Sequence, residues 1–515
     1  MLTAASGQVG MFDAAVLCEG MVPRDSFYGL LAEHGHRIVR DEDFAECYSA
    51  GRGRPSIPPS LLAKVLLLQL RTGLSDEGAM EALRFDLRWK LALGLAIDHG
   101  GFHPTTLTKF RARLLLHGKE RLALENTLRL AEELGLLDGP VEQLIDATPM
   151  LGAAATQDTV RLVRHGVRRL LDAVAATDAT TSERLAAGLE FDYARPGDKP
   201  DCRWRAKGER ERMLTRVAQD AERALRAVEQ VDALTGDEQV AAAAGLLREL
   251  IGQDFDIDAG GIPRLHHGTR PDRVLSVVDP QMRHGRKSPQ RRFDGFKLHA
   301  VATNTKAPLV TGIAVTPANL KDGQVAPTLI ASLPEQRRPK RLLGDAAYGH
   351  GPIRAALADC GVEVLAHRAG VPTRGSQTPK ADFAIDCAAG TVTCPHGRVA
   401  QITTQPSGQR SARFSETDCR ACPLKSRCVP TLKARRILIQ PEEEHLQAGQ
   451  RALADPQLAE HLRRTRPRIE RLLSLIAQRY HARRSRYLGT AKATLQAAWT
   501  AALVNLHPLA AALTT

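Results

Sequence analysis

One short stretch, 341–350, limits the possible folds of this chain more than any other. Its sequence RLLGDAAYGH contains a short apolar run that leads into Asp345, and small turn residues follow. A short apolar run bounded by glycine is typical of a buried strand in a parallel or mixed sheet. Pro352 then marks the first turn of a helix that stops at Gly361, before a second strand. The region therefore predicts a β-α-β unit with Asp345 at the strand's C-terminal end, where open α/β sheets bind ligands.

A second apolar segment also leads to a carboxylate. In VEQLIDAT, residues 141–148, a predicted strand ends at Asp146. Residues 155–250 then show the 3.6-residue apolar period of helices. Strand patterns return at three places, which are 274–278, 296–302 and 309–315. A hairpin turn separates the second of these from the third. One α/β core with a helical insertion is expected.

The third candidate acid lies in a strongly basic segment. Between His461 and Lys492 there are ten Lys or Arg residues and a single acid, Glu470. A solvated helix face normally mixes both signs of charge, so this excess favours phosphate contact. Glu470 borders an apolar stripe at helical spacing, formed by Ile469, Leu472, Leu473, Ile476 and Tyr480. A simple ion pair with neighbouring arginines is one interpretation of Glu470. The other is that three carboxylates converge on two Mg²⁺ ions, which prefer oxygen ligands.

The N-terminal part of the chain predicts an all-α unit. Helices are expected from Ser60 to Gly73, after a cap at Ser75, and from Thr105 or Thr106. Helix-turn-helix DNA readers are built from such pieces, and a plain helical bundle fits equally well. Candidate phosphate contacts are Lys109 and Arg111 on the last helix, together with Arg52 and Arg54. The last two lie in a turn-rich GRGRP segment, which fits a linker better than an arm in the minor groove of DNA.

Five of the nine cysteines cluster between 387 and 428. A disulfide framework is not expected in a long chain of the kind found in the cytosol. The spacing of Cys394, Cys419, Cys422 and Cys428 fits a structural tetrahedral Zn²⁺ site, with Cys387 left as a spare. Free thiols in a small β subdomain are the alternative.

Charge and hydropathy restrict the partners and the compartment. The net charge of +13 and the isoelectric point near 9.5 suit a polyanionic partner. No window of eighteen apolar residues predicts a membrane span, and the N-terminal residues lack the pattern of an export signal. A cytoplasmic protein is expected.

Together, these motifs resemble a bacterial insertion-sequence transposase of the DDE class, which has an RNase H-like catalytic core. The resemblance rests on the order of several short segments: 53–59, 73–76, 106–111, 293–297, 315–322, Gly344-Asp345 with Tyr348, Arg466-x3-Glu470, Gly489 and Asn505-Leu506. The third-acid signature differs at two positions, where Arg463 replaces a tyrosine and Ala477 replaces a lysine. We expect Arg479 or Arg483 to take the role of that lysine.

The resemblance implies a fold class, α/β with an RNase H-like mixed sheet flanked by helices, and a division of the chain. The expected parts are an N-terminal helical DNA-binding domain (1–135), a first part of the core (136–154), a helical insertion (155–265), the continued core (266–375), a cysteine-rich β insertion (376–445) and a C-terminal catalytic helix with core closure (446–515).

The resemblance also implies a chemistry. Asp146, Asp345 and Glu470 would hold two Mg²⁺ or Mn²⁺ ions, cleave the element's ends and transfer the 3′-hydroxyl to target DNA. Further DNA contacts are expected from Lys297, Arg466, Arg468, Arg479, Arg483, Arg484 and Arg486. The partners would be double-stranded DNA, from transposon ends and target, and a second copy of the chain, with no membrane contact. In a bacterium the protein would join the nucleoid when bound. A metal-dependent nuclease without strand transfer and a catalytically inactive DNA-binding descendant are the alternatives.

Overall fold

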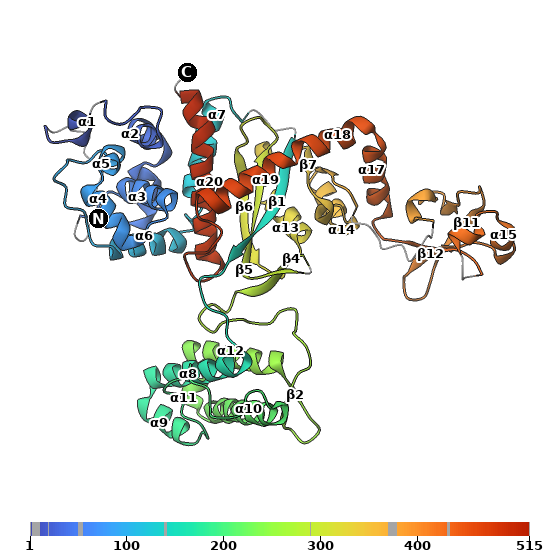
Figure 1. The fold of residues 1–515 in the computed structure, drawn as a ribbon, viewed down its shortest axis with the longest axis horizontal. Coiled ribbons are helices and arrows are strands. Elements are labelled where there is room, and N and C mark those ends of the chain that lie inside the picture. Colours follow the sequence, from blue (N-terminus) through green and yellow to red (C-terminus); the bar gives the residue numbers. More distant parts are fainter. Residues whose placement is uncertain are drawn as a thin grey trace.

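The structure is a computed structural model, and it describes residues 2, 11–18, 20–49, 55–137, 142–288, 290–368, 378–429 and 433–513. The fold is mixed α/β. Figure 1 shows a central sheet with N-terminal helices on one side, a small β unit far out on the other, and a separate helical unit below. The predicted α/β class is confirmed at this level.

The central sheet has six strands in the order β4-β5-β1-β7-β8, with β6 also paired to β5. β1 is antiparallel to β5 and parallel to β7, and β7 is parallel to β8. The predicted β-α-β unit is present, because α14 (Gly351–Ala358) connects β7 and β8 and has Pro352 in its first turn. The strands are β1 (Glu142–Leu151), β4 (Arg283–Ser288), β5 (Arg291–Thr303), β6 (Val310–Pro317), β7 (Arg341–Leu343) and β8 (Glu363–Leu365).

The strand predicted at 274–278 is wrong. These residues form no strand, although Val274, Leu275 and Val277 are buried. Their backbone hydrogen bonds go partly to side chains, since Gln253 Oε1 accepts from the Val274 N–H and Gln157 Oε1 from the Val277 N–H. This apolar run is buried without pairing with another strand, which its sequence pattern does not reveal.

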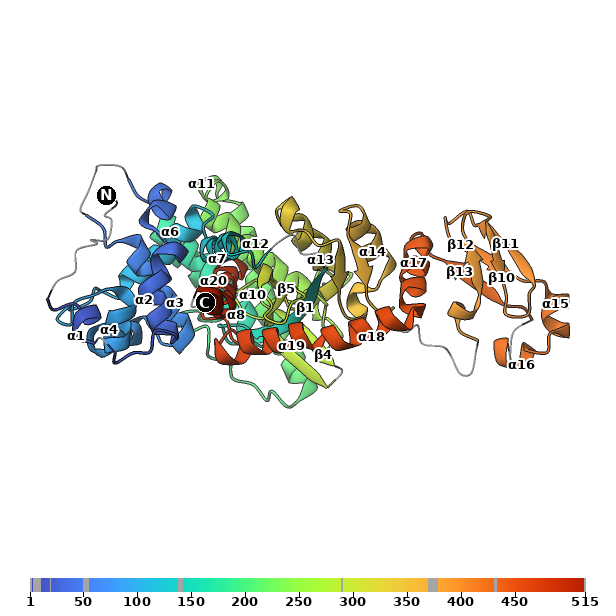
Figure 2. The same cartoon turned by 90° about the horizontal axis from the view of Figure 1, so that it is seen from above.

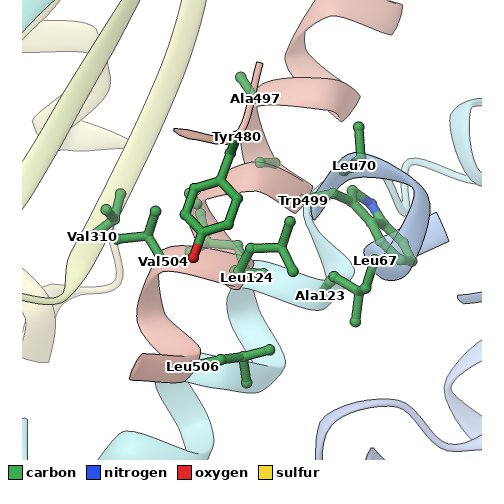
Figure 3. Packing of buried hydrophobic residues seen from close by; sticks show 14 of the residues in the cluster. Leu67, Leu70, Ala123, Leu124, Val310, Tyr480, Ala497, Trp499, Val504 and Leu506 are labelled. Atoms are coloured by element: carbon green, nitrogen blue, oxygen red, sulfur yellow. The ribbon is translucent and has the colours of Figure 1, made fainter. Parts of the chain in front are cut away.

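The N-terminal helices and the C-terminal helix share one core with the sheet. Ser75 caps α4 and Gly73 ends α3 in the left-handed region, as predicted. Trp499 of α20 (Thr490–Leu513) is fully buried against α3 and α7, while Val310 of β6 packs on another part of the same helix (Figure 3). The N-terminal helices are α1 (Ala14–Leu17), α2 (Phe27–Ile38), α3 (Pro59–Thr72), α4 (Asp76–Phe85), α5 (Leu87–Leu93), α6 (Thr105–Leu116) and α7 (Leu122–Glu133).

Two further units have small cores of their own. One is helical and follows β1, with a two-stranded sheet at its end: α8 (Thr159–Thr177), α9 (Ala179–Ala187), α10 (Lys207–Glu229), α11 (Asp232–Thr235), α12 (Glu238–Asp254), β2 (Phe255–Ile257) and β3 (Pro263–Leu265). The other, which we call the cysteine unit, is a five-stranded antiparallel sheet with two short helices: β9 (Ala384–Asp386), β10 (Thr391–Thr393), β11 (Val399–Thr404), β12 (Arg410–Arg413), α15 (Glu416–Ala421), α16 (Lys425–Cys428) and β13 (Arg436–Ile439).

The prediction of one long basic helix is wrong, because this segment forms a succession of shorter helices. α17 (Glu443–Ala454) leads to α18 (Pro456–Thr465) and α19 (Pro467–Ser474) (Figure 2). A π-helical turn then covers Leu475–Arg479. Pro467 has no N–H to donate, so it interrupts the helical hydrogen bonds between α18 and α19. The predicted apolar stripe is confirmed, because all five of its residues are buried, although Ile476 and Tyr480 lie beyond the end of α19. None of the described helices combines the length and apolarity needed to cross a membrane.

Candidate active site

The parallel register of β1 and β7 brings two of the predicted acids to the same level of the sheet. Residues 142–144 pair with Arg341–Leu343, an offset of 199 residues (341 − 142). Asp345 follows Asp146 by the same 199 residues (345 − 146). Because side chains alternate along a strand, Asp146 lies on the face of Leu144 and Asp345 on the face of Leu343. The two acids therefore stand at matching positions just beyond the paired segment.

The two acids differ in their local backbone. Asp345 lies at the C-terminal end of β7, as predicted, with Gly344 between the last strand residue and the acid. Its Oδ1 accepts a hydrogen bond of 2.8 Å from the Ala347 N–H. Asp146 lies in the middle of β1 and not at the end of its strand, which corrects the prediction. The strand continues to Leu151 because β5 pairs with it as far as Gly295, after β7 has ended. Asp146 thus sits just beyond the level at which β7 and β8 end, where only β5 and β6 still continue the sheet beside β1.

Glu470 comes from α19, which packs against β1. Its side chain is 51% exposed and forms an ion pair of 2.9 Å with Arg466. Ile469 and Leu473 beside it are buried. The predicted position at the border of the packed face is confirmed, and the ion pair expected as the simpler interpretation is also present.

All three acids line a single cavity of about 570 Å³. Five cationic side chains stand in the same walls: Arg286, Lys287, Lys297, Arg466 and Arg483. A fourth acid, Asp322 at the start of α13 (Asp322–Ala331), also lines the cavity and pairs with Lys297 at 2.7 Å. Asp322, Arg286 and Lys287 are cavity residues that the sequence analysis does not predict. The cations could have been found from the Arg/Lys-rich run at 283–292, whereas Asp322 carries no signal beyond its place in the 315–322 segment.

The cavity is electrostatically uneven. Burial raises the pKa of Asp146 to about 6, and the negative charges of Asp345 and Glu470 add to the rise. Burial also raises the pKa of Tyr348, with contributions from Asp146, Asp322 and Asp345. The Tyr348 hydroxyl is buried and has no hydrogen-bond partner among the described residues. Tyr348 does not line the cavity, but its buried hydroxyl is close enough to feel the negative charge of three acids that do.

The donor set fits divalent cations in its chemistry. Carboxylate oxygens are the ligands that Mg²⁺ and Mn²⁺ prefer, and a bound cation would relieve the charge that raises the pKa of Asp146. Within the described ranges, no three His, Cys, Asp or Glu side chains lie close enough to hold a metal ion as they stand. The acids share a cavity but must move towards one another to share an ion.

Several predicted DNA contacts have partners inside the fold. Arg111 pairs with Asp76 and lies over the Tyr487 ring, and Arg468 Nη1 donates to Asn304 Oδ1 at 2.7 Å. Arg486 donates to the Leu74 carbonyl. Lys297 is held by Asp322. Four other predicted contacts are exposed: Lys109, Arg479, Arg483 and Arg484. Arg52 and Arg54 lie outside the described residues.

The four cysteines predicted as zinc ligands gather around one small cavity. Cys394, Cys419, Cys422 and Cys428 all line a space of about 30 Å³ in the cysteine unit, together with His396. Cys387 is not among the lining residues, which agrees with its expected role as a spare. The Arg398 N–H donates to Cys394 Sγ at 3.3 Å, a bond that orients this sulfur. As in the acidic cavity, no three of these ligands are close enough to hold an ion as they stand.

An acidic cavity with cationic walls on a mixed α/β core is typical of enzymes that process the phosphodiesters of nucleic acids. Two family comparisons make this more specific. Residues 393–510 match the transposase DDE domain family, and residues 17–113 match a transposase domain family (DUF772). The matches support an insertion-sequence transposase of the DDE class, so the predicted resemblance is confirmed.

The two matched regions do not cover all of the candidate site. Glu470 and the four zinc-ligand candidates fall within the DDE match, whereas Asp146 and Asp345 fall in neither region. Those two acids are therefore assigned to the candidate site by their register and their shared cavity. No curated protein and no solved structure matches the chain.

Proposed function

We propose that this chain is a DNA transposase that binds the terminal inverted repeats of an insertion sequence, cleaves its ends and transfers the 3′-hydroxyl to target DNA. One observation carries the proposal: three acids from segments far apart in the sequence, Asp146, Asp345 and Glu470, line one cavity with cationic walls. A DNA phosphate is repelled by bare carboxylates, so such a cavity accepts it only with cations present.

The topology of the sheet supports an RNase H-like core. Numbered in chain order without β4, the strands β1, β5, β6, β7 and β8 stand in the spatial order 3-2-1-4-5. The first three form an antiparallel meander and the last two run parallel to β1. This arrangement is the one expected of an RNase H-like sheet. On this proposal, the helical unit after β1 and the cysteine unit after β8 are insertions in that core.

In the proposed site, Asp146, Asp345 and Glu470 hold two Mg²⁺ or Mn²⁺ ions. Such ions supply an activated water and stabilise the attacking and leaving oxygens of a phosphodiester. Arg466 stands beside Glu470 in the cavity wall, so it is positioned to bind a phosphate flanking the reacting one. The N-terminal helices, with exposed Lys109, are proposed to bind the terminal repeats. Because two ends must be held together, we propose a homodimer as the acting form.

Zinc is proposed as a structural cofactor of the cysteine unit. Its small core contains only seven buried apolar residues in the described part. A unit of this size usually needs a metal or disulfides for stability, and all the described cysteines are free thiols. Four thiolates around one cavity match the usual ligand set of structural Zn²⁺.

The test is a product analysis with the DNA ends that flank the element in its genome. Wild-type protein with Mg²⁺ or Mn²⁺ should nick at the element's borders and join the resulting 3′-ends to a target duplex. Nicks without joined products would favour a nuclease without strand transfer. Binding to the ends without metal-dependent nicks would favour an inactive descendant that only binds DNA.

A further inference from the structure

The hairpin formed by β4 and β5 carries a dense group of cations. Five Arg or Lys residues lie between 283 and 292. At its base, Arg283 pairs with Glu249 and His284 with Asp294. The other four cations, which we call the hairpin cations, are exposed and have no acidic partner among the described residues: Arg286, Lys287, Arg291 and Arg292.

The strand register makes this arrangement electrostatically unfavourable in the free protein. Arg286 stands directly opposite Arg292 in the antiparallel pair. Like charges at opposed positions of two strands destabilise the pair. A solvated surface usually mixes both signs of charge, as the hairpin base does and the outer part does not. A polyanion bound along the hairpin would remove the repulsion.

The hairpin cations are connected to the acidic cavity. Arg286 and Lys287 line it together with Asp146 and Asp345, and Phe293 of β5 lies in the same wall. From there the hairpin extends along the end of the sheet nearest the α8–α12 unit (Figure 1). The six residues of β4 span about 20 Å, the length of about six base pairs of duplex. DNA with one phosphate at the acids therefore has its neighbouring phosphates within reach of the hairpin.

We propose that the β4–β5 hairpin is a DNA-binding arm, whose hairpin cations hold the backbone phosphates of the duplex beside the position of cleavage. This inference rests on the proposed function, because it uses the acidic cavity as the place of cleavage. It adds a contact surface that reads no base sequence, since phosphate contacts position DNA without specifying it.

The experiment measures the affinity for a duplex of about 30 base pairs between about 50 and 200 mM salt. The double variant Arg286→Ser/Arg292→Ser should flatten the slope of log K against log salt by nearly two. Arg286→Lys/Arg292→Lys keeps the charge and should keep the slope. Arg226→Ser/Arg248→Ser, which removes two exposed arginines of the α8–α12 unit, is the matched control and should also keep it.

A thermal melt without DNA separates loss of binding from loss of folding. The serine variant should melt no lower than the wild type, because it relieves a repulsion. If the serine variant retains the wild-type salt slope while the wild type binds and cuts DNA, the proposal of a DNA-binding arm is contradicted and the proposed function stands. If the wild type neither binds nor cuts DNA, the proposed function fails and the arm fails with it.

Discussion

At the residue scale, Asp146 combines burial with neighbouring negative charge, and both act on its pKa. Its partner Asp345 lies at the matching position of the next strand, and Glu470 reaches the same cavity from a helix. The sequence could predict each acid separately, because each ends or borders an apolar run. The equal offset of 199 residues becomes meaningful only once the pairing of β1 with β7 is known, since register depends on tertiary packing.

The pKa of Asp146 gives a prediction for Asp146→Asn. Its folded pKa of about 6 exceeds the ordinary value of 3.8, so the folded state binds the proton more tightly. Stability from this group is present at low pH and is lost as the pH rises from about 3.8 to 6. The amide should therefore raise the free energy of unfolding by roughly 1–3 kcal/mol at pH 8 and change it little at pH 4.

Urea denaturation without divalent cations, followed by the fluorescence of buried Trp89 and Trp499, measures this difference. Added Mg²⁺ should stabilise the wild type more than the variant. An equal effect of the substitution at both pH values would show that folding does not raise the pKa of Asp146.

At the scale of elements, the segment that follows Glu470 is clamped to the N-terminal helices. His481, after the π-helical turn, has φ of +58°, and its ring lies where a Cβ on Gly73 would be. Arg486 donates to the Leu74 carbonyl, and the Tyr487 ring lies under Arg111. The same segment bonds to β1 through Leu151. The helix that carries Glu470 is thus tied both to the predicted DNA-binding helices and to the strand of Asp146.

Two glycines test the clamp. Gly73 and Gly94 both end helices in the left-handed region, but only Gly73 has a neighbour, the His481 ring at 2.8 Å from an added Cβ. Gly94→Ala should lose about 1–2 kcal/mol of stability from backbone strain alone. Gly73→Ala should lose about 1–3 kcal/mol more, because the His481 ring must shift. Calorimetry of both variants measures the difference, and equal losses would mean that the contact is loose.

The cysteine unit gives a second prediction at this scale. Purified protein should contain one zinc ion per chain, measured by elemental analysis. Cys422→Ser should lose the zinc and lower the melting temperature, because one of four ligands is gone. Cys387→Ser is the matched control and should keep both. If the wild type is purified without zinc and has the same melting temperature as Cys422→Ser, the zinc site is contradicted and the cysteines are plain thiols.

At the scale of the whole molecule, residues from distant parts of the sequence form one hydrophobic core. Trp89 and Phe110 of the N-terminal helices, Phe296 of β5 and Trp499 of α20 belong to one buried cluster. Local patterns predicted α3, α4, α6, the β5–β6 hairpin and the β-α-β unit, because caps, glycines and apolar periods are local signals. They did not predict that α20 packs between the N-terminal helices and the sheet, because its apolar residues cover nearly every face and indicate no direction.

Prediction of the candidate site from sequence has the same limit, because side-chain partners depend on the fold. Acids and cysteines were found from their types and spacing, and the structure brings each group to a common cavity. Arg111, Arg468 and Lys297 looked free to bind DNA, yet their partners Asp76, Asn304 and Asp322 lie far from them in the sequence. Charge can be read from a sequence, but the side chain that a charged group will bond to in the fold cannot.

The most direct test of the account is single-turnover cleavage of end DNA with Mg²⁺ by two variants of the same cavity. Asp345→Asn should slow cleavage by roughly 1000-fold while retaining DNA binding, because it removes a proposed metal ligand. Asp322→Asn makes the same chemical change in the acid that only holds Lys297, and it should slow cleavage by less than about tenfold. Cleavage by Asp345→Asn at the wild-type rate would contradict the assignment of this cavity as the catalytic centre.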